Sequence, residues 1–305
     1  MSSVEQFATS AKRITELPSP FREAIMGQVT ETAAVHELIY SPAFNTTKFR
    51  SPASVLCVTK QRWLIALLGE DRRIIVVQSS YDRTLSVELT LILLYGQLEM
   101  TYAANGEAKS VALQFNTVML GTYARAIQYI LDAIDQREQV ATSSLPLGNV
   151  VVSDWPLKFR NFSLLYAPKN SQFADGVCWG ETRAPFGREL APAAALLLTD
   201  RHVVVIAEER ITRWFQFRRT AKYGAIITYF PLSRLTGFQM VARHRVCTLQ
   251  IVASEQNGTK RFEILFPVDK QSAVSRFING IHDLECSAIS ELTAPTNIRL
   301  YKSFP

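Results

Sequence analysis

Short apolar runs separated by polar turns make up most of the chain. In the stretch 51–67, SPASVLCVTKQRWLIAL, two apolar runs flank a polar turn at 59–62. The stretch 191–207, APAAALLLTDRHVVVIA, has the same pattern around a turn at 199–202. Valine, isoleucine and aromatic residues are typical of half-buried strands. Each stretch therefore predicts a β-hairpin, and their likeness predicts that one unit occurs twice.

The runs that flank the two hairpins correspond in order. LIYSP (38–42) matches LLYAP (164–168), RIIVVQSSY corresponds to AIITYF, TLSVEL to RLTGFQM, and LEMTYAANGEAKSVALQF to LQIVASEQNGTKRFEILF. The last two runs contain Asn-Gly, at 105–106 and 257–258, between alternating apolar residues, which is a strong hairpin signal. Each copy then ends with apolar residues three and four positions apart, the spacing of an amphipathic helix.

Each copy therefore predicts seven short strands followed by one helix. In the first copy we expect strands near 37–44, 53–58, 62–68, 73–79, 85–94, 98–103 and 109–115, and a helix near 119–136. In the second copy we expect strands near 162–168, 193–198, 202–207, 224–230, 235–242, 246–253 and 260–266, and a helix near 270–285.

Seven antiparallel strands closed by one helix resemble the pleckstrin-homology (PH) superfold. The runs VLCVTKQRWLIAL and ALLLTDRHVVVIA resemble the first hairpin of GRAM-type and bacterial PH-like domains, in which a Thr-x-x-Arg turn joins two strands. The resemblance implies a β-dominated (α+β) fold of two tandem PH-like modules, each a seven-stranded antiparallel sandwich or partly open barrel with a C-terminal helix. We expect modules at 36–136 and 161–285, a linker at 137–160 and a tail at 286–305. Two unrelated antiparallel sandwiches are the alternative.

Residues 1–35 fall outside this repeat and predict a short helical segment. The apolar residues Val4, Phe7, Ala11, Ile14 and Leu17 lie on one face of a helix. A second helix is expected to begin at Ser19-Pro20, since a capping residue followed by proline is typical of a helix start. We expect this apolar face to pack on its own domain, and insertion into a membrane interface is the alternative.

The sequence contains no motif that indicates catalysis, a metal or a cofactor. A nucleophile elbow, a zinc-protease motif, a glycine-rich phosphate loop and a dinucleotide fingerprint are all missing. The four cysteines lie far apart, without the spacing of a zinc site. No apolar run approaches 18 residues, and the N-terminus lacks the order of a signal peptide. We therefore expect a cytoplasmic, non-catalytic protein without cofactor or small-molecule substrate, with a membrane periphery as the alternative location.

Positive charge is concentrated in the second half of the chain. Residues 1–150 hold 13 Lys/Arg and 14 Asp/Glu, whereas residues 151–305 hold 20 and 13. Between the third and fourth predicted strands of the second copy, the run EERITRWFQFRRTAKY carries Arg210, Arg213, Trp214, Phe215, Arg218, Arg219 and Lys222. The PH resemblance implies that this loop shares one open end with the loop carrying Lys169, Arg183 and Arg188 and the hairpin carrying Lys260 and Arg261. Many PH-like domains hold phosphorylated headgroups or peptides at that end.

Arginine mixed with aromatic residues is typical of protein interfaces. We therefore expect the second module to bind a protein partner or another copy of the chain, and the first module to serve as a scaffold. Three alternatives stay open for the basic aromatic loop. It could bind anionic membrane lipid, it could bind nucleic acid, or it could be an extended hairpin with buried aromatic residues and solvated arginines.

Overall fold

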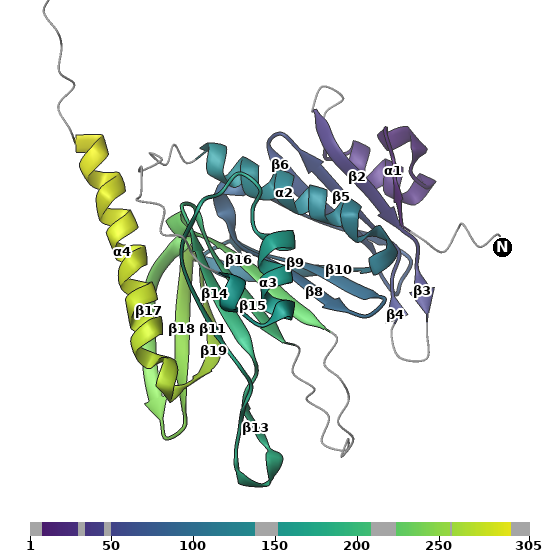
Figure 1. Ribbon diagram of the computed structural model, residues 1–305. Coiled ribbons are helices and arrows are strands. Elements are labelled where there is room, and N and C mark those ends of the chain that lie inside the picture. The colour runs from purple at the N-terminus through teal and green to yellow at the C-terminus, as the bar shows by residue number, and fades with distance from the viewer. Residues whose placement is uncertain are drawn as a thin grey trace, which may run out of the picture.

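The computed structural model describes residues 8–29, 34–45, 50–137, 152–208, 224–256 and 258–293 (Figure 1). Antiparallel strands dominate these ranges, so the strand-rich fold predicted from the hydrophobic pattern is confirmed. The elements form two halves. Each half has a short helix, then a series of strands, and ends with a longer helix.

The described residues of the first half form two α-helices and ten strands. They are β1 (Thr9–Ser10), α1 (Ser19–Met26), β2 (Val35–Ser41), β3 (Phe44–Asn45), β4 (Arg50–Ser51), β5 (Ser54–Thr59), β6 (Arg62–Leu68), β7 (Ile74–Ser80), β8 (Thr84–Ile92), β9 (Tyr95–Ala104), β10 (Glu107–Asn116) and α2 (Leu120–Arg137). The seven longer strands and the final helix lie where the sequence predicts them.

The second half repeats this order. Its elements are α3 (Leu157–Tyr166), β11 (Phe173–Trp179), β12 (Thr182–Arg183), β13 (Glu189–Ala191), β14 (Ala194–Thr199), β15 (His202–Glu208), β16 (Ala225–Pro231), β17 (Leu235–Arg243), β18 (Val246–Glu255), β19 (Gly258–Pro267) and α4 (Gln271–Thr293). Six of the seven predicted strands and the final helix lie near their predicted positions.

The predicted strand at 162–168 is wrong, because helix α3 includes its first five residues. Pro156 precedes the helix, and Phe159 and Ser163, four residues apart, are buried on the face that packs against β14 and β15. The apolar run at 164–166 is therefore the end of a helix rather than a strand. The first long strand of this half is β11, seven residues later.

The N-terminal prediction is correct in one part and wrong in another. Helix α1 begins at Ser19, as the Ser-Pro pair predicts. The preceding helix is reduced to one short 3-10 turn at Ile14–Glu16, because Thr9 and Ser10 pair as a strand with Tyr40 and Ile39. Residues 1–7, which include Val4 and Phe7, lie outside the described ranges.

The two halves share small irregularities as well as element order. Pair β2–β5 has a register shift between Val35 and Glu37, and pair β11–β14 has one at the corresponding place, between Phe173 and Asp175. Pairs β8–β9 and β17–β18 also share a shift at their first residues. A proline precedes both α1 and α3. The repeated unit therefore includes the short helix that the sequence comparison left outside it.

The strands form three main sheets. Their orders are β1-β2-β5-β6-β7, β10-β9-β8-β16-β15-β14-β11 and β17-β18-β19. The seven-stranded sheet joins the two halves, because β8 of the first half pairs with β16 of the second over five residue pairs, from Val87–Tyr229 to Leu91–Ala225. This backbone pairing makes the two halves one continuous structure.

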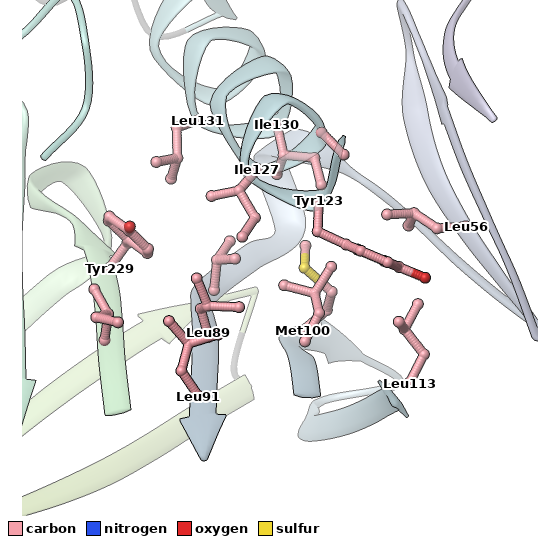
Figure 2. Packing of buried hydrophobic residues seen from close by; sticks show 14 of the residues in the cluster. Leu56, Leu89, Leu91, Met100, Leu113, Tyr123, Ile127, Ile130, Leu131 and Tyr229 are labelled. Carbon is pink, nitrogen blue, oxygen red and sulfur yellow. The ribbon is translucent and has the colours of Figure 1, made fainter. Parts of the chain in front are cut away.

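The hydrophobic core crosses the junction between the halves. Helix α2 lies over the joined strands, and Ile127 and Leu131 of α2 share one cluster with Leu89 of β8 and Tyr229 of β16 (Figure 2). A second cluster fills the space between β14–β16, β17–β19 and α4. A third lies beneath α1 on the outer face of the five-stranded sheet. Because the first cluster contains residues of both halves, we expect the halves to unfold together.

Candidate functional site

The basic aromatic loop predicted as the binding site lies outside the described residues. Its members Arg210, Arg213, Trp214, Phe215, Arg218, Arg219 and Lys222 all belong to the segment 209–223. The structure describes the two points at which this segment joins the sheet, which are Glu208 at the end of β15 and Gly224 just before β16.

One lysine contacts both ends of the segment 209–223. The Lys158 ammonium lies 3.0 Å from Glu208 Oε1 and donates a second hydrogen bond of 2.9 Å to the carbonyl oxygen of Gly224. The Lys158 and Glu208 side chains keep only 26% and 16% of their surface exposed. A charge-assisted pair this shielded from water is stronger than an exposed one. Lys158 on α3 therefore fixes the place where the segment leaves and rejoins the sheet.

The other predicted basic residues do not form one cluster. Lys169 follows α3 and its backbone N–H donates to Gln128 of α2, whereas Arg183 and Arg188 follow the far end of β11. A strand as long as β11 separates these positions by roughly 20 Å. Arg183 pairs with the Glu181 carboxylate at 2.9 Å. The predicted grouping of these three residues at one end is therefore wrong, because Lys169 precedes the first long strand of this half.

Lys260 and Arg261 lie in β19, opposite Ala253 and Val252. The Arg261 side chain is exposed, and that of Lys260 is half-buried. Lys260 is near the Glu88 carboxylate, since its positive charge acts to lower the pKa of that group. Part of the charge of Lys260 is therefore already compensated by an acid of the first half.

A cavity of about 250 Å³ opens beside Glu208, between β14–β16 and β19. Its walls are mainly apolar, and its lining includes Ala194, Val205, Ala207, Ile226, Phe230, Phe262 and Ile264. Glu88, Glu208 and Glu263 also line it. The cavity is just below the usual size of a small-molecule site, so it suits an apolar side chain or a compact ligand that carries a hydrogen-bond donor.

Glu88 is an acid of this cavity whose pKa is raised. Burial raises its pKa, and the nearby Glu99 carboxylate raises it further. A hydrogen bond of 3.1 Å from Thr228 Oγ1 and the charge of Lys260 act in the opposite direction. Since Thr228 belongs to β16, this hydrogen bond also links the two halves. Within the described ranges, no three His, Cys, Asp or Glu side chains lie close enough together to hold a metal ion.

The turn between β8 and β9 exposes two leucines. Leu93 and Leu94 keep 68% and 69% of their surface exposed, and Val118 beside them keeps 63%. Thr117 holds the turn, with its N–H donating to Leu94 O and its hydroxyl to Leu93 O. The turn lies at the same end of the sheet as Gly224, because Leu91 is the partner of Ala225. We call residues 93–94 the leucine turn.

The leucine turn departs from ordinary turn chemistry. Leu93 has a φ of 52°, in the left-handed region where a side chain with a Cβ is disfavoured. Two-residue hairpin turns of this kind prefer Gly, Asn or Asp. The β9–β10 turn has this chemistry, with Asn105-Gly106, whereas the corresponding turn of the second half begins with His244, whose φ of 47° is also left-handed. Sequence reasoning missed this site, although a leucine pair between two strand patterns was its visible signal.

A buried polar cluster lies where α2 meets the second half. His202 is fully buried, with Nε2 3.5 Å from Asp135 Oδ1 of α2, and Arg201 pairs with the same carboxylate at 3.4 Å. Burial lowers the pKa of His202 to about 3, and the charge of Arg201 lowers it as well. The imidazole is therefore neutral at pH 7. The cluster connects the halves and does not face a cavity described above.

No protein-family model matches the chain, and no curated protein matches it. None of the helices in the described ranges combines the length and hydropathy needed to cross a bilayer.

Proposed function

We propose that the protein is a non-catalytic binding protein of two tandem PH-like modules. Its partner is another protein or a second copy of the chain. The contact surface is the end of the second module where the segment 209–223 joins the sheet, together with the leucine turn. The PH-like assignment is supported by the composition of each half, in which four long strands and then three long strands precede a helix that packs on them.

The leucine turn is the observation that carries this proposal. Two adjacent leucines are exposed at a position where Leu93 also has an unfavourable φ. Leu93 strains the backbone of the turn and exposes apolar surface to water. Residues that lower stability in this way are found mainly where function requires them. Exposed apolar side chains beside a charged surface are typical of interaction sites. The leucine turn therefore supports a contact that covers it.

The neighbouring residues extend this surface. Leu157 keeps 62% of its surface exposed and directly precedes Lys158, which contacts both ends of the segment 209–223. That segment contributes Trp214, Phe215 and several arginines by sequence. Leucine contacts surrounded by aromatic residues and arginine fit the composition of protein interfaces.

An anionic membrane is the second candidate partner, and the leucine turn also supports it. A hairpin tip of two leucines could insert below the lipid headgroups, where each buried leucine contributes about 2 kcal/mol. Basic residues nearby contribute about 1 kcal/mol each. The two candidates differ in whether association requires lipid.

The proposal is tested by light-scattering mass over a range of concentrations for the native chain and the Leu93→Asn/Leu94→Ser variant. Asparagine tolerates the left-handed φ, so this variant keeps the turn and removes its apolar surface. The matched control is His244→Asn/Arg245→Ser in the corresponding turn of the second half. We expect the native mass to rise with concentration, the variant to rise less than the native chain at each concentration and the control to rise as the native chain does.

A native mass that stays at one chain removes self-association, and the same three proteins are then mixed with vesicles of phosphatidylserine and phosphatidylcholine. Pelleting that rises with phosphatidylserine and is lost in the leucine-turn variant supports the membrane alternative. If the variant and the native chain behave alike in both assays, the proposed surface is wrong.

A further inference from the structure

Inside the chain, β8 of the first half pairs with β16 of the second half. The counterparts of these two strands in the opposite halves, β17 and β7, lie at the edges of their sheets. Strand β8 begins the three-stranded part of the first half, and its counterpart in the second half is β17. Strand β16 ends the four-stranded part of the second half, and its counterpart in the first half is β7. Among the described strands, β7 and β17 each pair with only one neighbour.

We propose that β17 of one copy pairs with β7 of another copy, in the arrangement by which β8 pairs with β16 within one chain. The matched strands have equal lengths, seven residues for β7 and β16 and nine for β8 and β17. Since Ile226 is the partner of Thr90 inside the chain, the same register places Ile75 opposite Val241 of the second copy. It also places Val76 opposite Met240 and Val77 opposite Gln239.

Strand β7 has the chemistry of an edge that pairs. Its first four residues, Ile74 to Val77, are all β-branched and apolar, and Ile75 keeps 54% of its surface exposed. Edge strands that stay unpaired usually carry charge or proline. In β7 the described residues include neither. Pairing would cover Ile75 and provide partners for the outward backbone groups of the strand.

One contact of β7 matches a contact of β16. The Gln78 amide donates to Gln28 Oε1 just after α1, and the corresponding Tyr229 hydroxyl donates to the Tyr166 carbonyl at the end of α3. The short helices themselves pack differently, since α1 contacts mainly β7 and β6, whereas α3 contacts mainly β14 and β15. Helix α1 covers the face of β7 that carries Ile74 and Val76, whereas Ile75 lies on the opposite face and is exposed.

Strand β17 provides the complementary edge beside α4 (Figure 1). Phe238 and Met240 pack toward the core of the second half, with the Phe238 ring 6.2 Å from that of His282 in α4. Val241 is half-buried and Gln239 is exposed. Helix α4 has His282 where α2 has Leu131, so the contact between copies is less apolar than the internal junction. We expect a weak, concentration-dependent association.

This contact is head-to-tail, because it uses different surfaces on the two copies. After two copies pair, one copy keeps a free β7 and the other keeps a free β17, so association continues into a ring or an open filament. The continued growth distinguishes edge pairing from a two-fold dimer. Edge pairing also differs from contact at the leucine turn, because the two surfaces use different residues.

The test uses full-length chains that carry Leu93→Asn/Leu94→Ser, so that the leucine turn does not contribute. In this background we add Ile75→Lys to one protein and Val241→Lys to another. We expect the parent to exceed its single-chain mass of 34.3 kDa as its concentration rises from about 1 µM to about 1 mM, the range of weak interfaces. Each lysine variant should remain at one chain, because a lysine at a paired edge opposes strand addition.

An equimolar mixture of the two lysine variants gives the decisive result. One variant keeps a native β17 and the other keeps a native β7, so the mixture should reach twice the single-chain mass and go no further. Val118→Lys, at an exposed position away from both edges, is the control and should associate like the parent. If the thermal midpoint shows that Val241→Lys is unstable, Gln239→Lys at an exposed position replaces it.

A parent that stays at one chain throughout the concentration range overturns the proposal. An equimolar mixture of the two lysine variants that stays at the single-chain mass also overturns it, because that mixture contains both a native β7 and a native β17. Because all these proteins lack the two leucines, either failure concerns the strand edges alone and leaves the leucine-turn surface as proposed. A leucine-turn variant that associates as strongly as the native chain removes that surface and leaves the edge pairing untouched, whereas a native protein that stays at one chain removes both forms of self-association.

Discussion

Replacing Ile227 by alanine should destabilise both halves at once. Ile227 is fully buried in β16 opposite Leu89 of β8, within the cluster that also contains α2. A buried isoleucine-to-alanine change costs about 3 kcal/mol of unfolding free energy, within a range of about 2–5 kcal/mol. The entropy of unfolding for a chain of this length is about 0.6 kcal/mol/K, so the melting temperature should fall by about 5 °C.

The assay is urea unfolding followed by the fluorescence of a single tryptophan. One protein keeps only Trp63, which lies in the cluster of the first half, and another keeps only Trp179, which lies in the cluster of the second half. Ile227→Ala should lower the midpoint seen by both tryptophans equally, since one core connects the halves. Val118→Ala, at an exposed position, is the control and should change the free energy by less than about 0.5 kcal/mol. An unchanged Trp63 midpoint, or two separate transitions, would refute the shared core.

Two further predictions follow from buried titratable groups. Burial lowers the pKa of His202 from 6.5 to about 3, so the unfolded chain binds more protons between these values and stability falls as pH drops through this window. The loss should reach about 2 kcal/mol at pH 5 relative to pH 7.5, and thermal melts of His202→Phe should show a smaller pH dependence of the midpoint than the native chain. Burial raises the pKa of Cys57 to about 12 and that of Cys178 to about 11, so both thiols stay protonated at pH 8. Iodoacetamide followed by mass spectrometry should modify them only after unfolding, and rapid labelling of Cys57 in the folded chain would contradict its burial.

The positions of most strands could be predicted because each strand carries its own alternating pattern. The turn residues between strands, such as Thr59 and Thr199, bond the backbone of their own turns in the same way, so both hairpins are local features. Helix α3 was missed because the run at 164–168 resembles a strand in composition, whereas contacts of Phe159 with the sheet decide its conformation. The local hydrophobic pattern does not distinguish a strand from a helix in this run.

The junction between the halves and the candidate site were not predictable in the same way. Nothing in the local pattern of β8 or β16 specifies that they pair with each other, because the pairing depends on the packing of α2 over both strands. The composition of the basic segment is visible in the sequence. The contact that fixes its ends, between Lys158 and Gly224, is not visible there, because these residues lie far from each other in sequence. The leucine turn was visible in sequence, but its meaning depends on the exposure and φ of Leu93.

The most direct test of the proposed binding surface is to measure stability and association together in the Leu93→Asn/Leu94→Ser variant. We expect the free energy of unfolding to stay the same or rise by about 1 kcal/mol, because asparagine relieves the left-handed strain at position 93. We expect the concentration-dependent mass, or the vesicle binding, to fall in the same protein. A variant that is less stable than the native chain and associates as strongly would show that the leucines serve the fold, and it would contradict the proposed surface.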